Sequence, residues 1–156
     1  MLQNFMAVAT TLHILAVIVW IGGMFFAHMA LRPVVASLLE PALRLQLMAQ
    51  VLGRFFLWVW IAVILLWVTG LWMILEYFGG MVNVRISIHI MLTFAIIMTL
   101  LYIYIFFMPF PKLKHALSTK DFNQAGKHLA KIRSLISFNL VLGLVTVVIA
   151  TGGFYL

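Results

Sequence analysis

The residues best suited to chemistry are two histidines that lie in strongly apolar segments. His13 belongs to LHILAVIVWIGGMFF, in which Trp20 follows it after two helical turns, and His89 belongs to RISIHIMLTF. An ionisable side chain is costly in hydrocarbon, so each histidine needs a polar partner or a ligand. Two neutral imidazoles on different helices of a bundle are suited to axial ligation of a b-type haem, which needs no cysteine.

Counted from the same end of their segments, His13 and His89 lie at similar depth on two different helices. We therefore predict that they ligate the iron of haem b. Neighbouring side chains complete the predicted site: Arg85 to pair with a propionate, Trp20 to lie beside the macrocycle, and Thr10 or Thr93 to accept a hydrogen bond from a ligating imidazole. The alternative is that each histidine only hydrogen-bonds a Thr, a Ser or a backbone carbonyl on a neighbouring helix.

A second group with ligand chemistry consists of Met24, His28 and Met29. Thioethers and imidazole suit Cu(I), and Met24 and His28 are one helical turn apart. This group predicts a copper site, as an alternative to haem, toward the other end of the same segment. Packing of methionine in an apolar interior is the competing explanation.

The composition is typical of an integral membrane protein. The chain of 156 residues is 66% hydrophobic and 8% charged, and its mean hydropathy is +1.21. A helix needs about 20 apolar residues to cross a bilayer. Four such segments are present, at about 5–31, 55–78, 84–108 and 131–156. We predict a single domain with an all-α fold, an antiparallel, up-and-down four-helix transmembrane bundle.

Several kinds of chemistry are excluded by residue type. The sequence has no cysteine, which removes disulfides, thiolate metal sites, iron–sulfur clusters and covalent haem attachment. The acidic residues are Glu40, Glu76 and Asp121, and they form no carboxylate pair. No serine triad or glycine-rich phosphate loop is visible, so a hydrolase is not expected. An oxidoreductase whose chemistry belongs to a bound cofactor stays open.

The positive charge is concentrated in two connections between the spans. Arginines 32, 44 and 54 lie in the first connection, and Lys112, Lys114, Lys120, Lys127, Lys131 and Arg133 lie in the second, whereas the opposite side has Arg85. The positive-inside rule therefore predicts a bacterial-type inner-membrane protein with both basic connections in the cytoplasm and both termini outside. We expect these cations to face anionic lipid headgroups, and we expect no nucleic acid partner.

The connections and the fourth span carry further local signals. We expect residues 32–54 to lie along the membrane surface before the second span begins. A helix should start after Ser118-Thr119 and run into the fourth span. In that span Asn139, Gly143, Thr146 and Ala150 form a stripe of small and polar residues that should face the bundle.

Three segments resemble the membrane domain of the copper-resistance protein D (CopD) family. LHILAVIVWIGGMFF resembles its first helix, GRFFLWVWIAVILLWVTGLWM resembles its second helix, and KIRSLISFNLVLGLVTVVIATGG is similar to its final helix. The resemblance covers most of the chain. It implies the four-helix membrane fold and a role connected with copper.

The His-x6-Trp-x-Gly pattern, here His13, Trp20 and Gly22 or Gly23, is similar to that of the related HemJ-type protoporphyrinogen oxidases. That resemblance implies a haem b protein. Those enzymes carry a Lys shortly after a His in the third helix, and Met91 stands at that position here. The difference argues against protoporphyrinogen oxidation.

Three functions are compatible with these observations. The leading hypothesis is a haem b-binding membrane protein of the CopD/HemJ-like group, with a redox or electron-transfer role and a redox partner. The alternative is binding of copper or its transport across the inner membrane. The third is a non-catalytic subunit that binds a partner protein through its helices. Self-association is compatible with all three.

Overall fold

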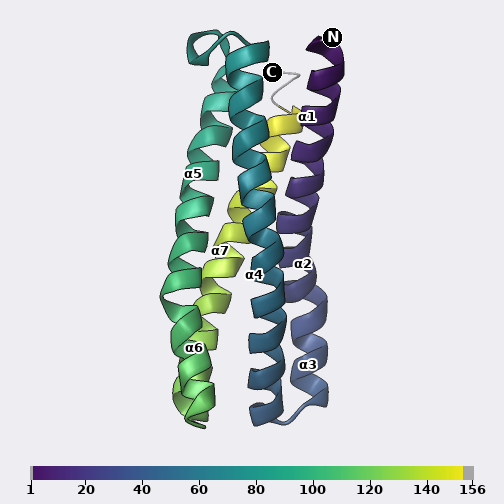
Figure 1. Ribbon diagram of the computed structural model, residues 1–156. Helices are drawn as coiled ribbons and strands as arrows, with labels where there is room; N and C mark the ends of the chain where they lie inside the picture. Colours follow the sequence, from purple (N-terminus) through teal and green to yellow (C-terminus); the bar gives the residue numbers. More distant parts are fainter. Residues whose placement is uncertain (1, 153–156) are drawn as a thin grey trace.

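The computed structural model describes residues 2–152, which form four long helical rods (Figure 1). The first rod comprises α1 (Leu2–Val17), the π-helical η1 (Ile18–Gly22), α2 (Gly23–Phe26), the π-helical η2 (Ala27–Leu31) and α3 (Arg32–Leu38). The second rod comprises α4 (Pro41–Trp72) and the π-helical η3 (Met73–Tyr77), and a 3-10 turn, η4 (Met81–Asn83), leads to the third. The third rod comprises α5 (Ile86–Phe107) and α6 (Pro109–Ser118), and the fourth is α7 (Phe122–Gly152). These residues contain no strand, and the predicted all-α, up-and-down bundle is confirmed.

The two ends of the bundle differ in charge and in what they contain. The connections from α3 to α4 and from α6 to α7 lie at one end, which we call the basic end (Figure 1). Residue 2, residue 152 and the turn from η3 to α5 lie at the opposite end, which we call the terminal end. Which end faces the cytoplasm stays a prediction.

Each rod holds a segment that is long and apolar enough to cross a membrane: Gln3–Leu38, Pro41–Tyr77, Ile86–Ser118 and Phe122–Gly152. Each predicted span falls largely within one of these rods, and residues 153–156 of the fourth lie outside the described part of the chain. The protein is therefore a multi-pass membrane protein.

The expectation for residues 32–54 is wrong. The first rod continues through α3, and only two residues separate the end of α3 from the start of α4, so no helix turns aside along the membrane surface. The physical reason is burial, because Leu45, Met48 and Leu52 face the protein core in this part of α4. The expectation for the second connection is confirmed, since α7 starts at Phe122 and runs without a break to Gly152.

Apolar and aromatic side chains from all four rods form one core cluster. Tyr102 of α5 is at its centre, with edge-to-face ring contacts to Trp20, Phe56 and Trp60 at centroid separations of 6.2, 5.7 and 5.2 Å. Its hydroxyl donates a hydrogen bond of 2.7 Å to the backbone oxygen of Phe56. Each edge-to-face pair stabilises the fold by about 0.5–1.5 kcal/mol beyond the burial of the rings. This cluster therefore fixes how the first rod, α4 and α5 are rotated.

The rods are arranged so that α1 packs along α4, and α5 packs along α7. In Figure 1, α4 and α7 lie between α5 and α1. At mid-height Trp20, in η1, extends from the first rod to Tyr102. Near the terminal end the first and third rods therefore face different neighbours, which matters for any site that needs a residue from each.

The stripe predicted on α7 faces the bundle over part of its length. Asn139 and Gly143 are buried, Thr146 is half-buried, and Ala150 is exposed. A Cβ atom at position 143 would lie 3.0 Å from the side chain of Ile21, so a small residue there lets α7 approach the first rod. The stripe thus separates into a packing surface and an open end.

Candidate functional site

His13 lies in the interface between α1 and α4, near the terminal end. Its ring is half-buried, and Nδ1 lies 2.8 Å from the Oγ1 of Thr69 on α4. The neighbouring Gly70 makes room for the ring, because a Cβ atom at that position would lie 3.4 Å from the Cε1 of His13. A Thr-Gly pair on one helix therefore holds the imidazole of the other.

The hydrogen bonds of Thr69 favour one tautomer of His13. The Thr69 hydroxyl has one hydrogen, which it donates to the backbone oxygen of Leu65 at 2.6 Å. In this arrangement it acts as an acceptor toward His13, which favours the neutral ring with its proton on Nδ1. The second nitrogen, Nε2, keeps its lone pair. A metal-binding histidine is held in the same way, with one nitrogen donating to a fixed oxygen and the other available as a ligand.

A thioether lies one helical turn from this contact. The hydroxyl of Thr10 on α1 donates to the sulfur of Met73 at 3.8 Å. Thr10 and His13 are one turn apart on α1, and Thr69 and Met73 are one turn apart along the second rod, so the two contacts are adjacent rungs between antiparallel helices. We call His13, Met73, Thr10 and Thr69 the His13 site.

The polar partners of the histidines differ from those predicted. Thr10 does not accept a hydrogen bond from His13; its hydroxyl turns to Met73. The Thr93 hydroxyl donates a hydrogen bond of 2.9 Å to the backbone oxygen of His89, one turn earlier on the same helix. Thr69 was missed, although it is the one hydroxyl residue in the apolar run from 55 to 75. Such a lone polar residue was the available signal.

The structure does not bring His89 into the His13 site. His89 lies half-buried in the first turn of α5, which packs along α7, while His13 faces α4. Arg85, immediately before α5, and Thr93 are both exposed. Trp20 is only 4% exposed and contacts Tyr102 in the core. Ligation of haem iron by His13 and His89 stays a prediction.

The residues of the alternative copper group, Met24, His28 and Met29, also lie in different surroundings. Met24 is buried in the core and 2% exposed, whereas Met29 is 58% exposed on the outer surface. His28 lies between them in η2, with its two ring nitrogens 3.3 and 3.4 Å from the Oγ of Ser137 on α7. Met24 and Met29 therefore face different surroundings, and a copper site made from all three residues stays a prediction.

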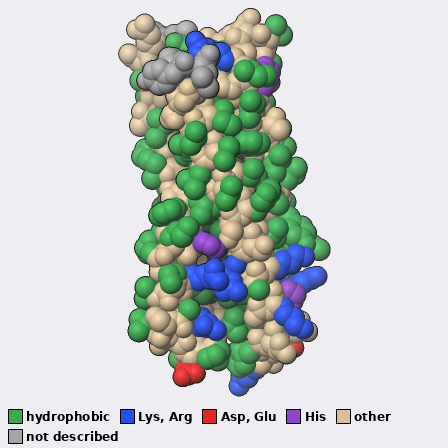
Figure 2. Space-filling model, turned by 180° about the vertical axis from the view of Figure 1, so that it is seen from behind, with side chains coloured by type: hydrophobic (Ala, Val, Ile, Leu, Met, Phe, Trp, Pro, Cys, Tyr) green, Lys and Arg blue, Asp and Glu red, His purple; other side chains and the backbone are tan. Residues whose placement is uncertain are grey.

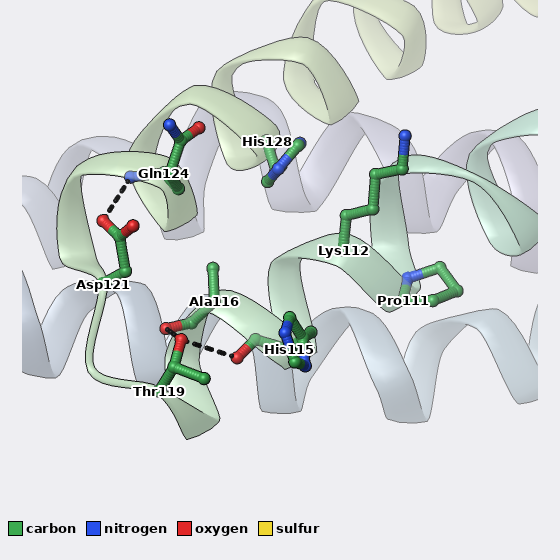
Figure 3. Close-up of a pocket in the computed structure, with 8 residues that line it drawn as sticks. All are labelled: Pro111, Lys112, His115, Ala116, Thr119, Asp121, Gln124 and His128. Atoms are coloured by element: carbon green, nitrogen blue, oxygen red, sulfur yellow. Dashed lines mark hydrogen bonds between the residues drawn. The ribbon is translucent and has the colours of Figure 1, made fainter.

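A surface groove of about 480 Å³ lies at the basic end between α6 and α7 (Figure 3). His115 of α6 and His128 of α7 line it, together with Asp121, whose carboxylate accepts a hydrogen bond from the backbone amide of Gln124 at 3.0 Å. Within residues 2–152, no three His, Asp or Glu side chains come together as a metal-binding group. The groove is thus an open, polar surface feature.

Comparison with protein families provides the identification. The family model of copper resistance protein D matches residues 49–152. The chain belongs to the CopD family. The matched range begins within α4 and includes Thr69 and Met73 as well as His89, while His13 and His28 precede it. Comparisons with curated proteins and with solved structures found no match.

The family assignment confirms the resemblance seen in the second and fourth helices. It connects this multi-pass membrane protein with copper resistance. Copper is a soft metal in its reduced state, and imidazole nitrogen and thioether sulfur are suitable ligands for it. The residues of the His13 site fit Cu(I) by the chemistry of their donor atoms.

Proposed function

We propose that this CopD-family protein binds Cu(I) within the membrane, and that His13 and Met73 are the ligands at the terminal end. The observation that carries the proposal is the hydrogen bond from His13 Nδ1 to Thr69, because it leaves Nε2 as a lone-pair donor. The Met73 sulfur belongs to the adjacent rung of the same interface. Copper is then the cargo of the protein.

Buried thioethers give Cu(I) further soft contacts along the bundle. Met24, Met48 and Met98 are 2%, 6% and 4% exposed and belong to the common core cluster. Met48 also lines a small hollow beside His28 toward the basic end. We infer that movement of copper across the membrane would use these sulfurs between His13 and His28, because each of them can replace water as a ligand for a soft cation.

Haem b is the rival function, and one observation favours it as well. A free Nε2 on His13 suits haem iron as much as copper, and an axial haem ligand needs its Nδ1–H satisfied in the same way. This reading needs His89 as the second ligand, and it carries with it the proposed relationship to HemJ-type proteins and a redox role. The third reading, a membrane subunit that only binds a partner protein, needs neither ligand.

A titration of the purified full-length protein with Cu(I), against a chelator of known affinity, tests the proposal. We expect stoichiometric binding that weakens by about 10- to 100-fold in Thr69→Val, since loss of a supporting hydrogen bond typically costs that much in metal affinity. His13→Ala and Met73→Leu should weaken binding at least as much. Met108, an exposed methionine between α5 and α6, provides the matched control: Met108→Leu should bind as the wild type does.

The results of these measurements distinguish the copper, haem and partner-subunit functions. Copper affinity that is unchanged in both His13→Ala and Met73→Leu contradicts the proposed site. A larger loss in His28→Ala than in His13→Ala would move the copper site to the Met24 and His28 level. A red sample whose reducible absorption band disappears in His13→Ala and in His89→Ala, but not in His28→Ala, would establish haem instead. A sample that binds neither group would favour the partner-subunit reading.

A further inference from the structure

Three arginines from three different helices converge near the basic end. Arg32 of α3 and Arg133 of α7 line the same small hollow, beside His28. Arg32 and Arg44, the latter in α4, are close enough to Arg133 for their charges to repel its guanidinium. All three side chains are half-buried. We call Arg32, Arg44 and Arg133 the arginine cluster, and Figure 2 shows Lys and Arg side chains gathered at this end below a histidine.

The described part of the chain supplies this cluster with no ion-pair partner, since no carboxylate of residues 2–152 lies within ion-pair distance of the three guanidinium groups. The protein has three acidic residues. Asp121 accepts a hydrogen bond at the start of α7, Glu76 lies in η3 at the terminal end, and Glu40 lies between α3 and α4. Like charges brought together at a half-buried place repel more strongly than in water, so the cluster is incomplete without an anion.

The cluster is positioned by contacts between rods rather than by flexible loops. His28 contacts Ser137 across the interface between the first rod and α7. The Ser137 hydroxyl also donates a hydrogen bond of 2.9 Å to the backbone oxygen of Arg133. Arg32 is one turn beyond His28, and Arg133 is one turn before Ser137. Because the first rod and α7 run in opposite directions, both steps lead toward the basic end, and the two arginines meet at one level.

We propose that the arginine cluster is a binding site for a phosphate group. Guanidinium groups present planar, paired N–H donors that match phosphate oxygens, and they stay charged even when half-buried. The hollow beside them is lined mainly by apolar side chains, among them Leu52, Ile132 and Ile136. A phosphate at the rim of an apolar hollow is the chemistry of a phospholipid headgroup, and a free phosphate has the same charged group. The site is separate from the proposed copper ligands His13 and Met73, although its hollow is also lined by His28 and Met48.

Thermal unfolding of the full-length protein distinguishes the two sources of phosphate. The protein is reconstituted in phosphatidylcholine discs and heated with inorganic phosphate or with chloride at equal ionic strength, and then heated again in discs that contain phosphatidylglycerol. A ligand present at roughly ten times its Kd should raise Tm by about 3 °C or more. A response to inorganic phosphate in neutral discs supports a free phosphate, and a response only to phosphatidylglycerol supports a lipid headgroup.

Substitutions connect the response with the cluster. Arg32→Gln and Arg133→Gln should each lose more than half of the Tm increase, and Arg54→Gln, an exposed arginine of α4, should keep it. Removal of one cation also relieves repulsion, so Arg133→Gln should raise Tm in phosphatidylcholine discs with chloride. The proposal is overturned if neither phosphate source stabilises the wild type beyond its chloride or neutral-lipid control, or if the cluster variants respond as fully as Arg54→Gln. The first of these results would leave the arginines with only their role in membrane orientation.

Discussion

At the scale of single residues, the two adjacent glycines of the first rod have different surroundings. A Cβ atom at position 23 would overlap the ring of Phe55, whereas one at position 22 would meet nothing within 4 Å. Gly23 therefore allows the close approach of the first rod to α4 between the levels of His13 and His28, and Gly22 faces open space. At the level of Phe55, the close approach of these rods thus depends on Gly23.

Replacement of these glycines should have opposite effects on stability. Gly23→Ala must displace the Phe55 ring from a packed position, and we expect a loss of about 1–3 kcal/mol in the free energy of unfolding. Gly22→Ala should leave this free energy unchanged or raise it by up to about 1 kcal/mol, because alanine favours a helix. Unfolding by denaturing detergent, followed through tryptophan fluorescence, measures both. Equal effects in the two variants would mean that Phe55 moves aside freely.

At the scale of elements, the start of α7 is defined by a helix cap. Asp121 precedes the first helical residue, and its carboxylate accepts a hydrogen bond of 3.0 Å from the amide of Gln124. Lys120, with a φ angle of 57°, turns the chain between α6 and α7. The same turn closes one side of the groove that holds His115 and His128.

Loss of this cap should fray the first turn of α7. Asp121→Ala removes the acceptor for the Gln124 amide, at a cost of about 1 kcal/mol. Hydrogen exchange should then speed up for the amides of residues 122–126 and remain slow in the middle of the helix. Asp121→Asn is the control, because its amide oxygen still accepts the bond. If Asp121→Ala exchanges as slowly as Asp121→Asn, the cap does not stabilise α7.

At the scale of the whole molecule, nearly all the cationic side chains belong to the connections and helix ends at the basic end, and Arg85 lies at the terminal end. Positive residues are retained on the cytoplasmic side during insertion. This asymmetry predicts that the basic end is cytoplasmic, which would place His13 toward the outside and the arginine cluster toward the cytoplasm. Copper and phosphate would then be bound near opposite faces of the membrane.

A reporter of membrane sidedness tests this orientation. A reporter enzyme that is active only outside the cytoplasm should work when fused after Leu156 and should fail when inserted near Lys120, because the positive-inside rule keeps the latter connection in the cytoplasm. Activity at the Lys120 position and none at Leu156 would reverse the orientation of both sites. The copper titration and the thermal-unfolding response to phosphate would be unaffected, since they do not depend on sidedness.

The sequence by itself determined the features that depend on local composition. The length of the apolar segments predicted four membrane-spanning helices, the distribution of Lys and Arg predicted one basic end, and the polar residues after Thr119 predicted the start of α7; each helix and the basic end are present in the structure. The candidate site was predicted only in part. His13 was identified as a residue in need of a partner, but Thr69 was not recognised as that partner.

The tertiary structure decided which side chains meet. A membrane helix is apolar both toward lipid and toward protein, so its hydrophobic pattern does not say which face is buried. The contact of His13 with Thr69, the separation of His89 from it, and the meeting of Arg32 with Arg133 all depend on which rods are neighbours and how they are rotated. Rotation and neighbour choice follow from close packing of side chains such as Trp20 and Tyr102, which is a property of all four helices together.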